Sequence, residues 1–197
     1  MNLGYWIRRP RMAFRRLLYW RWERRNPDKP WLTPGAVAFL ESHLAPPMVG
    51  LEFGSGRSTP WFAARLGHLT SIEHHAGWAA TVRTRLADLG RTNVDHRLIP
   101  LDHTETEPER ESYDPLPEYV AAVAGFVDRS LEFIAVDGHY RTQCIRFALE
   151  KLKPGGLLLV DDANLWPGDA PPVPADWPVV SRTSNGLKIT AVWRRPS

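Results

Sequence analysis

The stretch that decides the fold is residues 49–60, VGLEFGSGRSTP. A short apolar run ends at Glu52. Gly54 and Gly56 come next, and two hydroxyl residues then precede a proline. Glycines tolerate the tight backbone of a turn, and a proline fits the first turn of a helix, where a missing N–H costs little. The stretch therefore predicts a strand, a glycine turn and a helix in immediate succession.

The pattern repeats downstream, with strands alternating with helices. Strands are predicted over residues 48–53, 68–74, 94–100, 131–138 and 157–162, and helices over 11–25, 34–43, 60–66, 76–89, 119–126 and 141–152, with a turn at KPGG (153–156). Two last strands, 179–183 and 187–194, flank an Asn-Gly turn. Alternation predicts a parallel sheet, and the tight turn predicts an antiparallel hairpin. We expect an α/β, Rossmann-like three-layer sandwich with a mostly parallel seven-stranded sheet and a C-terminal antiparallel hairpin.

Length and composition narrow the class of protein. A chain of 197 residues suits one domain that buries its own core. The single cysteine, Cys144, excludes an intramolecular disulfide and a cysteine-based zinc site, and it fits a reducing, cytoplasmic compartment. No apolar run approaches the roughly 18 residues of a membrane span. Arginines interrupt the N-terminus, so it lacks the apolar core of a secretory signal.

Residues 1–30 are predicted to form a basic aromatic N-terminal extension of a domain over 31–197. They hold eight Arg and one Lys against two acids, a net charge of +7, so the rest carries −4 within a total of +3. Arginine interleaved with Trp and Tyr suits an anionic membrane surface or a protein partner better than nucleic acid, because Trp prefers the headgroup level. Peripheral membrane attachment is thus one expectation. The helix could equally fold back on the domain.

Three kinds of ligand could occupy the glycine loop. A P-loop requires Gly-Lys-Ser/Thr, and no Lys is present between residues 49 and 60. A dinucleotide fingerprint, G-x-G-x-x-G, is matched at Gly54 and Gly56 but has Thr59 at the third glycine. The third candidate is an acid-x-Gly-x-Gly loop, in which Glu52 would attract a cation and repel a diphosphate. The glycines could also serve only the turn, and Ser58 or Thr59 could cap the helix.

The segment LEFGSGRST resembles the first motif of class I S-adenosylmethionine-dependent methyltransferases. The resemblance covers roughly residues 48–162 and the terminal hairpin, and LKPGGLLLVDD is similar to the turn and fifth strand of that class. In that family the glycines let the backbone approach the amino-acid part of the cofactor, and the acid lies near its ammonium group, directly or through water. The resemblance implies S-adenosylmethionine as cofactor, beside Glu52, Gly54, Ser55, Gly56, Ser58 and Thr59.

A second acid supports a nucleoside ligand. Glu73 ends the second predicted strand, 19 residues after Gly54. Ribose-binding Rossmann-like folds carry an acid at this strand end, about 20 residues after the glycine loop. A carboxylate there accepts both hydroxyl groups of a ribose. We expect His74 and Trp78 near the adenine or ribose, and Asp102, after the third strand, near the adenine amino group.

The fourth predicted strand brings Asp137 and His139 to the same rim. Methyl transfer needs an acceptor aligned with the sulfonium and usually a base for its proton. His139 is the natural candidate for that base, and Asp137 could orient it, take the proton itself or cap the next helix. Arg141 could bind an acidic acceptor. Tyr113 and Tyr119, in the long loop after the third strand, could form a lid or an acceptor wall.

A metal is a further expectation. The segments VDG and VDDANLW resemble the caffeoyl-CoA and catechol O-methyltransferases, in which an acid after strand four and an acid–Asn pair after strand five bind a divalent cation. Asp137, Asp161 and Asp162 would then supply oxygen ligands for Mg²⁺. This sequence departs from that pattern, because its pair is Asp-Asp, and Gly138 and His139 replace the family's Asp-Lys.

Together these patterns predict an S-adenosylmethionine-dependent methyltransferase that O-methylates a small molecule or a glycan. O-methylation is favoured because the rim carries His139 and carboxylates and lacks the Asn/Asp-Pro-Pro-aromatic motif of many N-methylating relatives. Two alternatives remain open, a nicotinamide-type oxidoreductase and a non-catalytic binding module. The acceptor and the oligomeric state are not encoded in any of these motifs.

Overall fold

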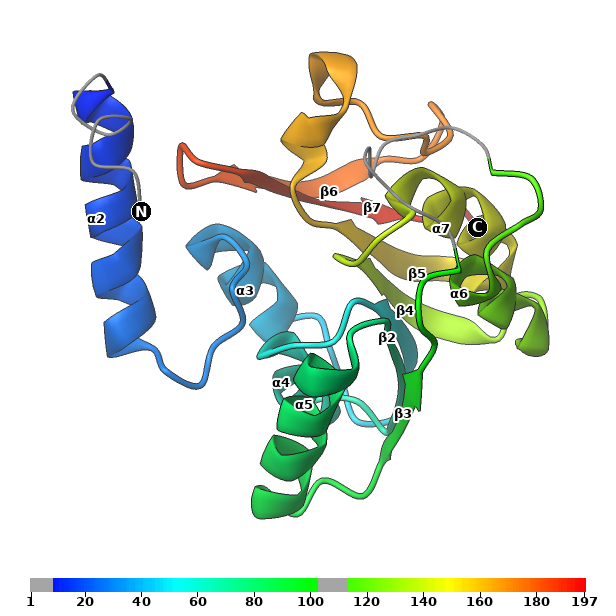
Figure 1. The fold of residues 1–197 in the computed structure, drawn as a ribbon. Helices are drawn as coiled ribbons and strands as arrows, with labels where there is room; N and C mark the ends of the chain where they lie inside the picture. Colours follow the sequence, from blue (N-terminus) through cyan, green and yellow to red (C-terminus); the bar gives the residue numbers. More distant parts are fainter. Residues whose placement is uncertain (1–8, 103–112) are drawn as a thin grey trace.

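The computed structural model describes residues 9–102 and 113–197, which form a seven-stranded sheet with helices on both faces (Figure 1). The strands are β1 (Val49–Phe53), β2 (His68–Glu73), β3 (Val94–Leu98), β4 (Leu131–Val136), β5 (Leu152–Val160), β6 (Val179–Ser184) and β7 (Ile189–Arg194). Their order is β3-β2-β1-β4-β5-β7-β6. Neighbours from β3 to β5 pair in parallel, whereas β7 is antiparallel to both β5 and β6. The predicted sheet and its terminal hairpin are confirmed.

The helices form the two outer layers. They are α2 (Pro10–Arg25), α3 (Pro34–Glu41), α4 (Ser58–Ala63), α5 (Ala76–Asp88), α6 (Glu118–Ala121) and α7 (Arg141–Ala148). The last two are shorter than predicted, because each passes into a 3₁₀ turn, at Ala122–Gly125 and at Leu149–Lys151. None of the described helices is long and apolar enough to cross a bilayer.

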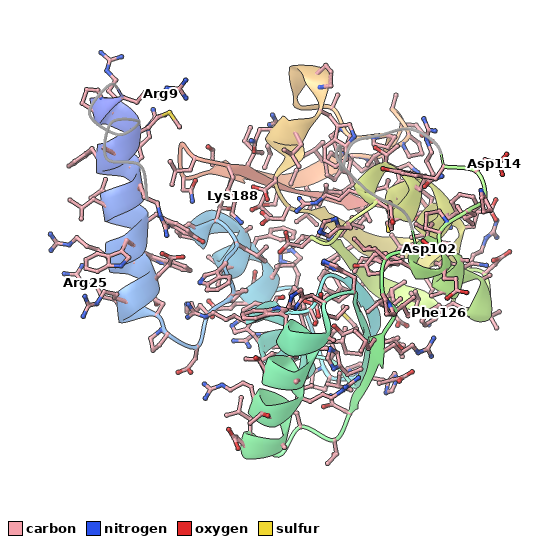
Figure 2. All side chains as sticks on the ribbon, in the orientation of Figure 1. Arg9, Arg25, Asp102, Asp114, Phe126 and Lys188 are labelled. Atoms are coloured by element: carbon pink, nitrogen blue, oxygen red, sulfur yellow. The ribbon has the colours of Figure 1, made fainter. Side chains whose placement is uncertain are left out.

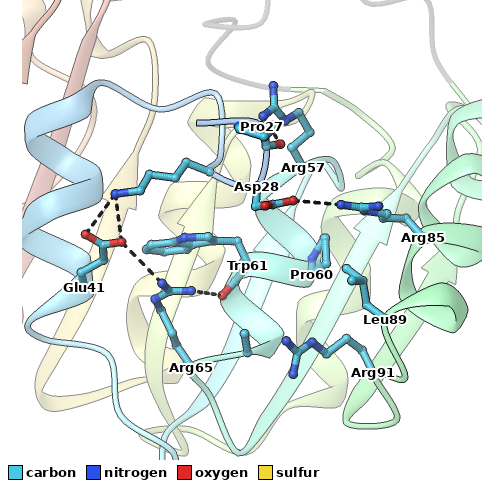
Figure 3. Close-up of a pocket in the computed structure, with 12 residues that line it drawn as sticks. Pro27, Asp28, Glu41, Arg57, Pro60, Trp61, Arg65, Arg85, Leu89 and Arg91 are labelled. Carbon is cyan, nitrogen blue, oxygen red and sulfur yellow. Dashed lines mark hydrogen bonds and ion pairs between the residues drawn. The ribbon is translucent and has the colours of Figure 1, made fainter. Parts of the chain in front are cut away.

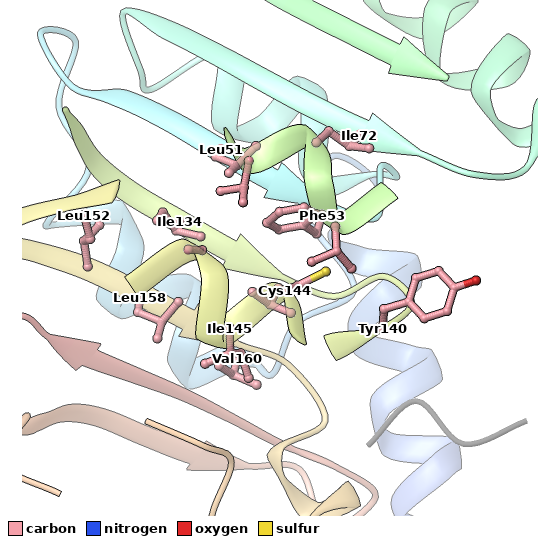
Figure 4. Packing of buried hydrophobic residues seen from close by; sticks show 14 of the residues in the cluster. Leu51, Phe53, Ile72, Ile134, Tyr140, Cys144, Ile145, Leu152, Leu158 and Val160 are labelled. Carbon is pink, nitrogen blue, oxygen red and sulfur yellow. The ribbon is translucent and has the colours of Figure 1, made fainter. Parts of the chain in front are cut away.

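Two apolar cores hold the layers together. Leu51, Phe53 and Ile134 alternate along β1 and β4 and pack against Cys144 and Ile145 of α7 (Figure 4). On the opposite face, α3 and α4 pack on the sheet through residues such as Leu40, Phe62 and Phe133. Side chains of a strand point alternately to the two faces, so a central strand contributes side chains to both cores.

The predicted turn at KPGG is wrong. These residues lie inside β5, which begins at Leu152 rather than at residue 157. Leu152 already pairs with Leu131, and the register then jumps, so that Phe133 pairs with Leu157. Gly155 has φ +79, a conformation that lets the extra residues bulge out of the strand. The glycines therefore shape an irregular strand and do not end it.

Helix α2 lies beside the sheet, next to the tip of the β6–β7 hairpin, with Arg9 and Arg25 marking its two ends (Figures 1 and 2). Tyr19 is buried, and its hydroxyl donates to the carbonyl of Leu32 at 3.0 Å. Arg15 Nη1 donates to the carbonyl of Gly186 in the hairpin turn at 3.2 Å. The predicted helix over residues 11–25 is confirmed, and it contacts the body of the protein along this side.

Strand order reverses between β1 and β4, since β2 and β3 follow on one side of β1 and β5 follows β4 on the other. In open α/β sheets a ligand binds beyond the carboxyl ends of the strands at such a switch point. The loops that leave Phe53 and Val136 are therefore the first place to look for a site.

Candidate functional site

A pocket of about 380 Å³ opens at the carboxyl ends of β1, β2 and β4. Ten of the predicted site residues line it: Gly54, Ser55, Gly56, Ser58, Glu73, His74, Trp78, Asp137, His139 and Arg141. Trp31, Arg57, His75 and Gly138, which the sequence patterns did not single out, complete its described walls. The glycine loop, the acid of β2 and the rim of β4 thus meet in one cavity.

Two glycines bring the loops after β1 and β4 into contact. Gly54 has φ +89, and a Cβ built on it would lie 2.6 Å from the backbone nitrogen and Cα of Gly138. A Cβ on Gly138 would lie 2.2 Å from the hydroxyl oxygen of Tyr119. Gly56 differs, because its Cβ would meet nothing closer than 3.8 Å. Gly54 and Gly138 therefore close the floor of the pocket, and Gly56 leaves space above it.

Glu52 is buried beneath this loop and does not line the pocket. Its Oε1 accepts the Ser58 hydroxyl at 2.5 Å, and its Oε2 accepts the hydroxyls of Thr59 and Ser71 at 2.7 and 2.6 Å. Burial raises its pKa to about 7, although the three hydroxyl groups oppose the rise. The expected contact of Glu52 with a cofactor ammonium group stays a prediction, and these three hydroxyl groups lie around its carboxylate. The same hydrogen bonds also replace the expected capping role of Ser58 and Thr59.

Glu73 lines the pocket, as predicted, but its oxygens also organise the loop. Oε2 accepts the backbone N–H and the hydroxyl of Ser55, both at 3.1 Å. Oε1 accepts the backbone N–H groups of His74 and His75 at 2.9 and 2.8 Å. A carboxylate has about four acceptor sites, so all of them are engaged. The Ser55 hydroxyl also lies 3.0 Å from His96 Nε2, so a ribose hydroxyl that took its place on Glu73 would leave it this second partner.

Aromatic residues cover the opening. Trp78 donates its indole N–H to the carbonyl of Ser55 at 2.7 Å and stacks on Trp31, with ring centroids 6.2 Å apart. The imidazole rings of His74 and His139 pack edge to face, with their centroids 4.2 Å apart. This contact joins the end of β2 to the end of β4. Trp78 and His74 both line the pocket, and the expectation that they lie near an adenine or ribose stays a prediction.

Arg141 ties the ends of β4 and β5 together. Its Nε donates to the carbonyl of Gly138 at 2.8 Å, and its two terminal nitrogens reach the carbonyls of Asp161 and Asp137 at 2.7 and 3.1 Å. The same nitrogens lie 3.4 Å from the carboxylates of Asp162 and Asp137. Its donors are therefore used within the protein. The expectation that Arg141 binds an acidic group of the acceptor is not supported by this geometry.

The predicted metal ligands do come together, because the carboxylate oxygens of Asp137, Asp161 and Asp162 lie within 4.8 Å of one another. Two protein cations already compensate them. Lys188 forms an ion pair with Asp161, and Arg141 bridges Asp137 and Asp162. Asp161 also accepts the Thr190 hydroxyl at 2.5 Å. This donor set does not fit Mg²⁺, which would have to displace an ammonium group held by charge from the acids around it.

Asp137 retains partial access to the pocket, with 32% of its side chain exposed. Burial raises its pKa to about 8; the negative charge of Asp161 adds to the rise, and Arg141 opposes it. A carboxyl group with a pKa near neutrality can exchange a proton during a reaction. Asp137 and His139 both line the pocket, and the basic role that the sequence divided between them stays a prediction.

Three predicted residues lie away from the pocket walls. Tyr119 is fully buried, and its hydroxyl donates to the carbonyl of Ile72 at 3.4 Å. Tyr113 is 9% exposed and packs edge to face on Tyr140 in the same core. They support the floor from below, so the predicted lid is wrong for both. Asp102 accepts the backbone N–H of Glu118 at 2.9 Å and begins the helix that carries Tyr119. The rest of the predicted lid, residues 103–112, lies outside the described residues.

A separate basic depression of about 300 Å³ lies outside the rim, against α4 and α5 (Figure 3). Arg85 pairs there with Asp28 at 3.0 Å, and Glu41 lies between Lys29 and Arg65. Arg57 reaches both cavities. The depression lacks the glycine loop, the rim carboxylates and the histidines, so we place the functional site at the switch point.

The comparisons with known proteins concern the fold. No protein-family model and no curated protein sequence matches the chain. Among solved structures, it superposes on a protein of Escherichia coli described as a "putative methyltransferase" with a TM-score of 0.61 and 16% identity, over 81% of this chain and 83% of that one. An RNA methyltransferase of Salinibacter ruber, solved with S-adenosyl-L-homocysteine, gives 0.56 and 16% over 86% and 95%.

A third structure, a "putative O-methyltransferase" of Klebsiella pneumoniae, gives a TM-score of 0.55 and 19% identity over 82% of this chain and 78% of that one. At such identities the likeness concerns the fold. The chain has the Rossmann-like fold of class I S-adenosylmethionine-dependent methyltransferases, and the resemblance carried by LEFGSGRST is confirmed at that level.

Proposed function

We propose that the protein is an S-adenosylmethionine-dependent methyltransferase that acts on a hydroxyl group of a small molecule or glycan. The observation that carries this proposal is the convergence of the Gly54–Gly56 loop, Glu73 and Asp137 on one pocket at the switch point. The pocket has the size of a small-molecule site. It offers aromatic surface for a purine at Trp78 and Trp31, and the Glu73 carboxylate lies in its wall.

The pocket could hold this cofactor with both the backbone of the glycine loop and the side chains around it. Gly56 leaves open space beside Ser58 and Trp78, so an amino-acid moiety can lie against the loop. Glu73 lies below the place of a ribose, and His74 and Trp78 border the place of an adenine. S-adenosylmethionine, when bound, would supply a sulfonium methyl group to the acceptor.

Asp137 is the group that we assign to the acceptor's proton. The bound cofactor would give up its methyl group to the acceptor oxygen and keep the electron pair on sulfur, so that the acceptor hydroxyl would have a proton to lose. The hydroxyl proton would pass to Asp137 in its ionised form, which a raised pKa of about 8 makes the major form only above about pH 8. Arg141 holds Asp137 by its side chain and its carbonyl, and His139 forms the neighbouring wall.

Calorimetric titration of the full-length protein tests the proposal. We expect S-adenosylmethionine and S-adenosylhomocysteine to bind, and NAD(H) to give no heat. Binding of NAD(H) without S-adenosylmethionine would support the oxidoreductase alternative, to which Thr59 is the main obstacle: it occupies the third glycine's place and is fully buried with its hydroxyl on Glu52. If no nucleotide bound, a non-catalytic interaction module would be the better interpretation.

A further inference from the structure

A second cavity, of about 430 Å³, adjoins the proposed cofactor pocket. Trp31 lines both cavities. Asp162 lines the second one and lies 3.4 Å from Arg141, which lines the first. The second cavity therefore lies directly beside the part of the cofactor pocket that is formed by Trp31 and Arg141. Its remaining walls come from the ends of the chain, namely α2 and the tip of the β6–β7 hairpin.

The charges around this cavity are compensated. Arg16 and Glu23 of α2 pair with each other at 3.1 Å across one wall. On the other side Lys188 pairs with Asp161, and Asp162 lies close to Arg141. No net positive charge remains to attract a phosphate or a nucleic-acid backbone, and no net negative charge remains to attract a cation. The walls are polar but balanced, which favours a neutral polar occupant.

One polar atom in this wall requires a partner. Asn185 lines the cavity, and its Oδ1 accepts the backbone N–H groups of Leu187 and Lys188 at 2.9 and 3.0 Å. These bonds fix the orientation of the amide, whose Nδ2 is buried and has no hydrogen-bond partner among the described residues. Leaving such a donor unsatisfied costs roughly 1–3 kcal/mol. Because this nitrogen has almost no accessible surface, a ligand oxygen would reach it only after a shift of the β6–β7 turn.

We propose that this cavity is the acceptor site, and that it takes a neutral hydroxylated ring such as a sugar, held by Trp31 and Asp162. The inference rests on the proposed methyl transfer and names its acceptor class. Trp31 is 46% exposed and provides apolar surface for the carbon face of such a ring. Carboxylate and amide groups around an aromatic residue supply the donors and acceptors that hydroxyl groups need.

Under this assignment α2 belongs to the acceptor site. Tyr19 anchors the helix through Leu32, one residue from Trp31, and it also lines the cavity. The residues of α2 that line the cavity, including Arg16 and Glu23, would then contact the acceptor and help to determine which acceptor fits. The basic aromatic extension predicted from sequence therefore has a second role that composition alone does not reveal.

Transfer of a tritiated methyl group from S-adenosylmethionine to a panel of methyl glycosides tests the assignment. The panel contains the glucosides, galactosides, mannosides, rhamnosides and N-acetylglucosaminides, with a short RNA, glucose 6-phosphate and a catechol as competing acceptor classes. We expect the full-length protein to methylate at least one glycoside. Leu187→Trp, which fills the cavity from the hairpin, should raise the KM for that glycoside at least tenfold and leave the Kd for S-adenosylmethionine unchanged.

Leu89→Trp is the matched control, because Leu89 is exposed in the separate basic depression and borders neither the cofactor pocket nor the second cavity. Leu187→Phe provides a milder filling if the larger ring lowers the unfolding temperature. Unchanged KM in both Leu187 variants, or transfer to RNA, phosphate ester or catechol with no glycoside methylated, would overturn the assignment, as would no transfer to any acceptor. Failure of the wild-type protein to bind S-adenosylmethionine would instead reject the proposed function itself.

Discussion

Gly54 and Gly138 lie back to back, with the Cβ position of each closer than 3 Å to the backbone of the other. They belong to the loops that leave β1 and β4, the two strands at which the sheet reverses its order. A side chain on either residue would separate the loops. The pocket floor therefore depends on two residues 84 positions apart in the sequence.

Gly138→Ala should lower the free energy of unfolding by about 1–3 kcal/mol, because the new methyl group would overlap the Tyr119 hydroxyl and the Gly54 nitrogen. Urea denaturation measures the effect. Gly125→Ala is the control, since nothing lies within 4 Å of its Cβ position. Tyr119→Phe should recover part of the loss in a double mutant. Equal stability of the two alanine variants would contradict the close packing.

Gly56→Val should weaken binding of S-adenosylmethionine at least tenfold without destabilising the fold. Its Cβ position is open, with the Ser58 hydroxyl 3.8 Å and the Trp78 indole nitrogen 3.9 Å away, and these residues line the pocket. Calorimetry gives the affinity and thermal unfolding gives the stability. Gly125→Val should alter neither. Unchanged affinity in Gly56→Val would place the ligand elsewhere.

The buried Glu52 predicts a pH effect on stability. Its pKa rises from 4.5 to about 7 on folding, so between these values the folded protein holds the proton more tightly than the unfolded chain. Stability then falls as pH rises through this window, by about 3 kcal/mol for this one group. Below pH 4.5 and above pH 7 its contribution is constant.

Glu52→Gln should remove that contribution, because the amide does not titrate. The quantity to measure is the difference in unfolding free energy between wild type and variant, from pH 4.5 to 7, so that other groups cancel. We expect the wild type to lose stability relative to the variant across this range. A constant difference would show that Glu52 is ionised throughout.

Lys188→Met should destabilise the protein by roughly 3 kcal/mol, because it leaves the fully buried Asp161 without its cation. Asp161→Asn in the same chain should restore most of the loss, since the uncompensated charge is then gone. Chemical denaturation of the single and double variants gives both values. Additive losses would mean that the pair does not interact.

The same ion pair predicts that Mg²⁺ is not required. Titration of the wild type with Mg²⁺ should give no binding heat, and a chelator should leave methyl transfer unchanged. Lys188→Met provides the contrast, because it exposes the oxygens of Asp137, Asp161 and Asp162 to a cation. Loss of wild-type activity on chelation would restore the metal hypothesis.

The outer face of α2 supports the proposal that the extension binds an anionic membrane surface. Phe14, Leu17 and Leu18 are 60%, 49% and 51% exposed among arginines, and Trp20 is 43% exposed. Trp20→Ser with Phe14→Ser should reduce sedimentation with phosphatidylserine vesicles severalfold, and vesicles of phosphatidylcholine should bind weakly. Leu89→Ser is the control. Equal recovery with both kinds of vesicle would contradict a preference for an anionic surface, and no recovery with either would favour a protein partner for this face.

The glycine loop, the acid of β2 and the rim of β4 could be predicted because strand alternation places them at the same sheet edge. The sequence did not reveal which groups each polar side chain forms its hydrogen bonds with. Glu52 meets Ser58, Thr59 and Ser71, which are 6, 7 and 19 residues away, and only the folded register brings them together. Spacing predicts which residues share an edge, and burial decides which of them a ligand can reach.

Lys188 was missed for a related reason. It reaches the acidic rim because β7 runs antiparallel to β5, with Ala191 opposite Val160, so the residues before β7 lie beside Asp161. A hairpin was predicted, but its partner strand was not. With that register the lysine could have been placed beside the acids, and the metal hypothesis would have been weakened from sequence alone.

Trp31 lines both the proposed cofactor pocket and the second cavity, and this has a kinetic consequence. A bound cofactor that holds Trp31 against Trp78 would fix one wall of the second cavity before an acceptor enters that cavity. Under the two assignments proposed above, substrates add in a compulsory order with the nucleotide first. The spent nucleotide would then compete with the cofactor and not with the acceptor.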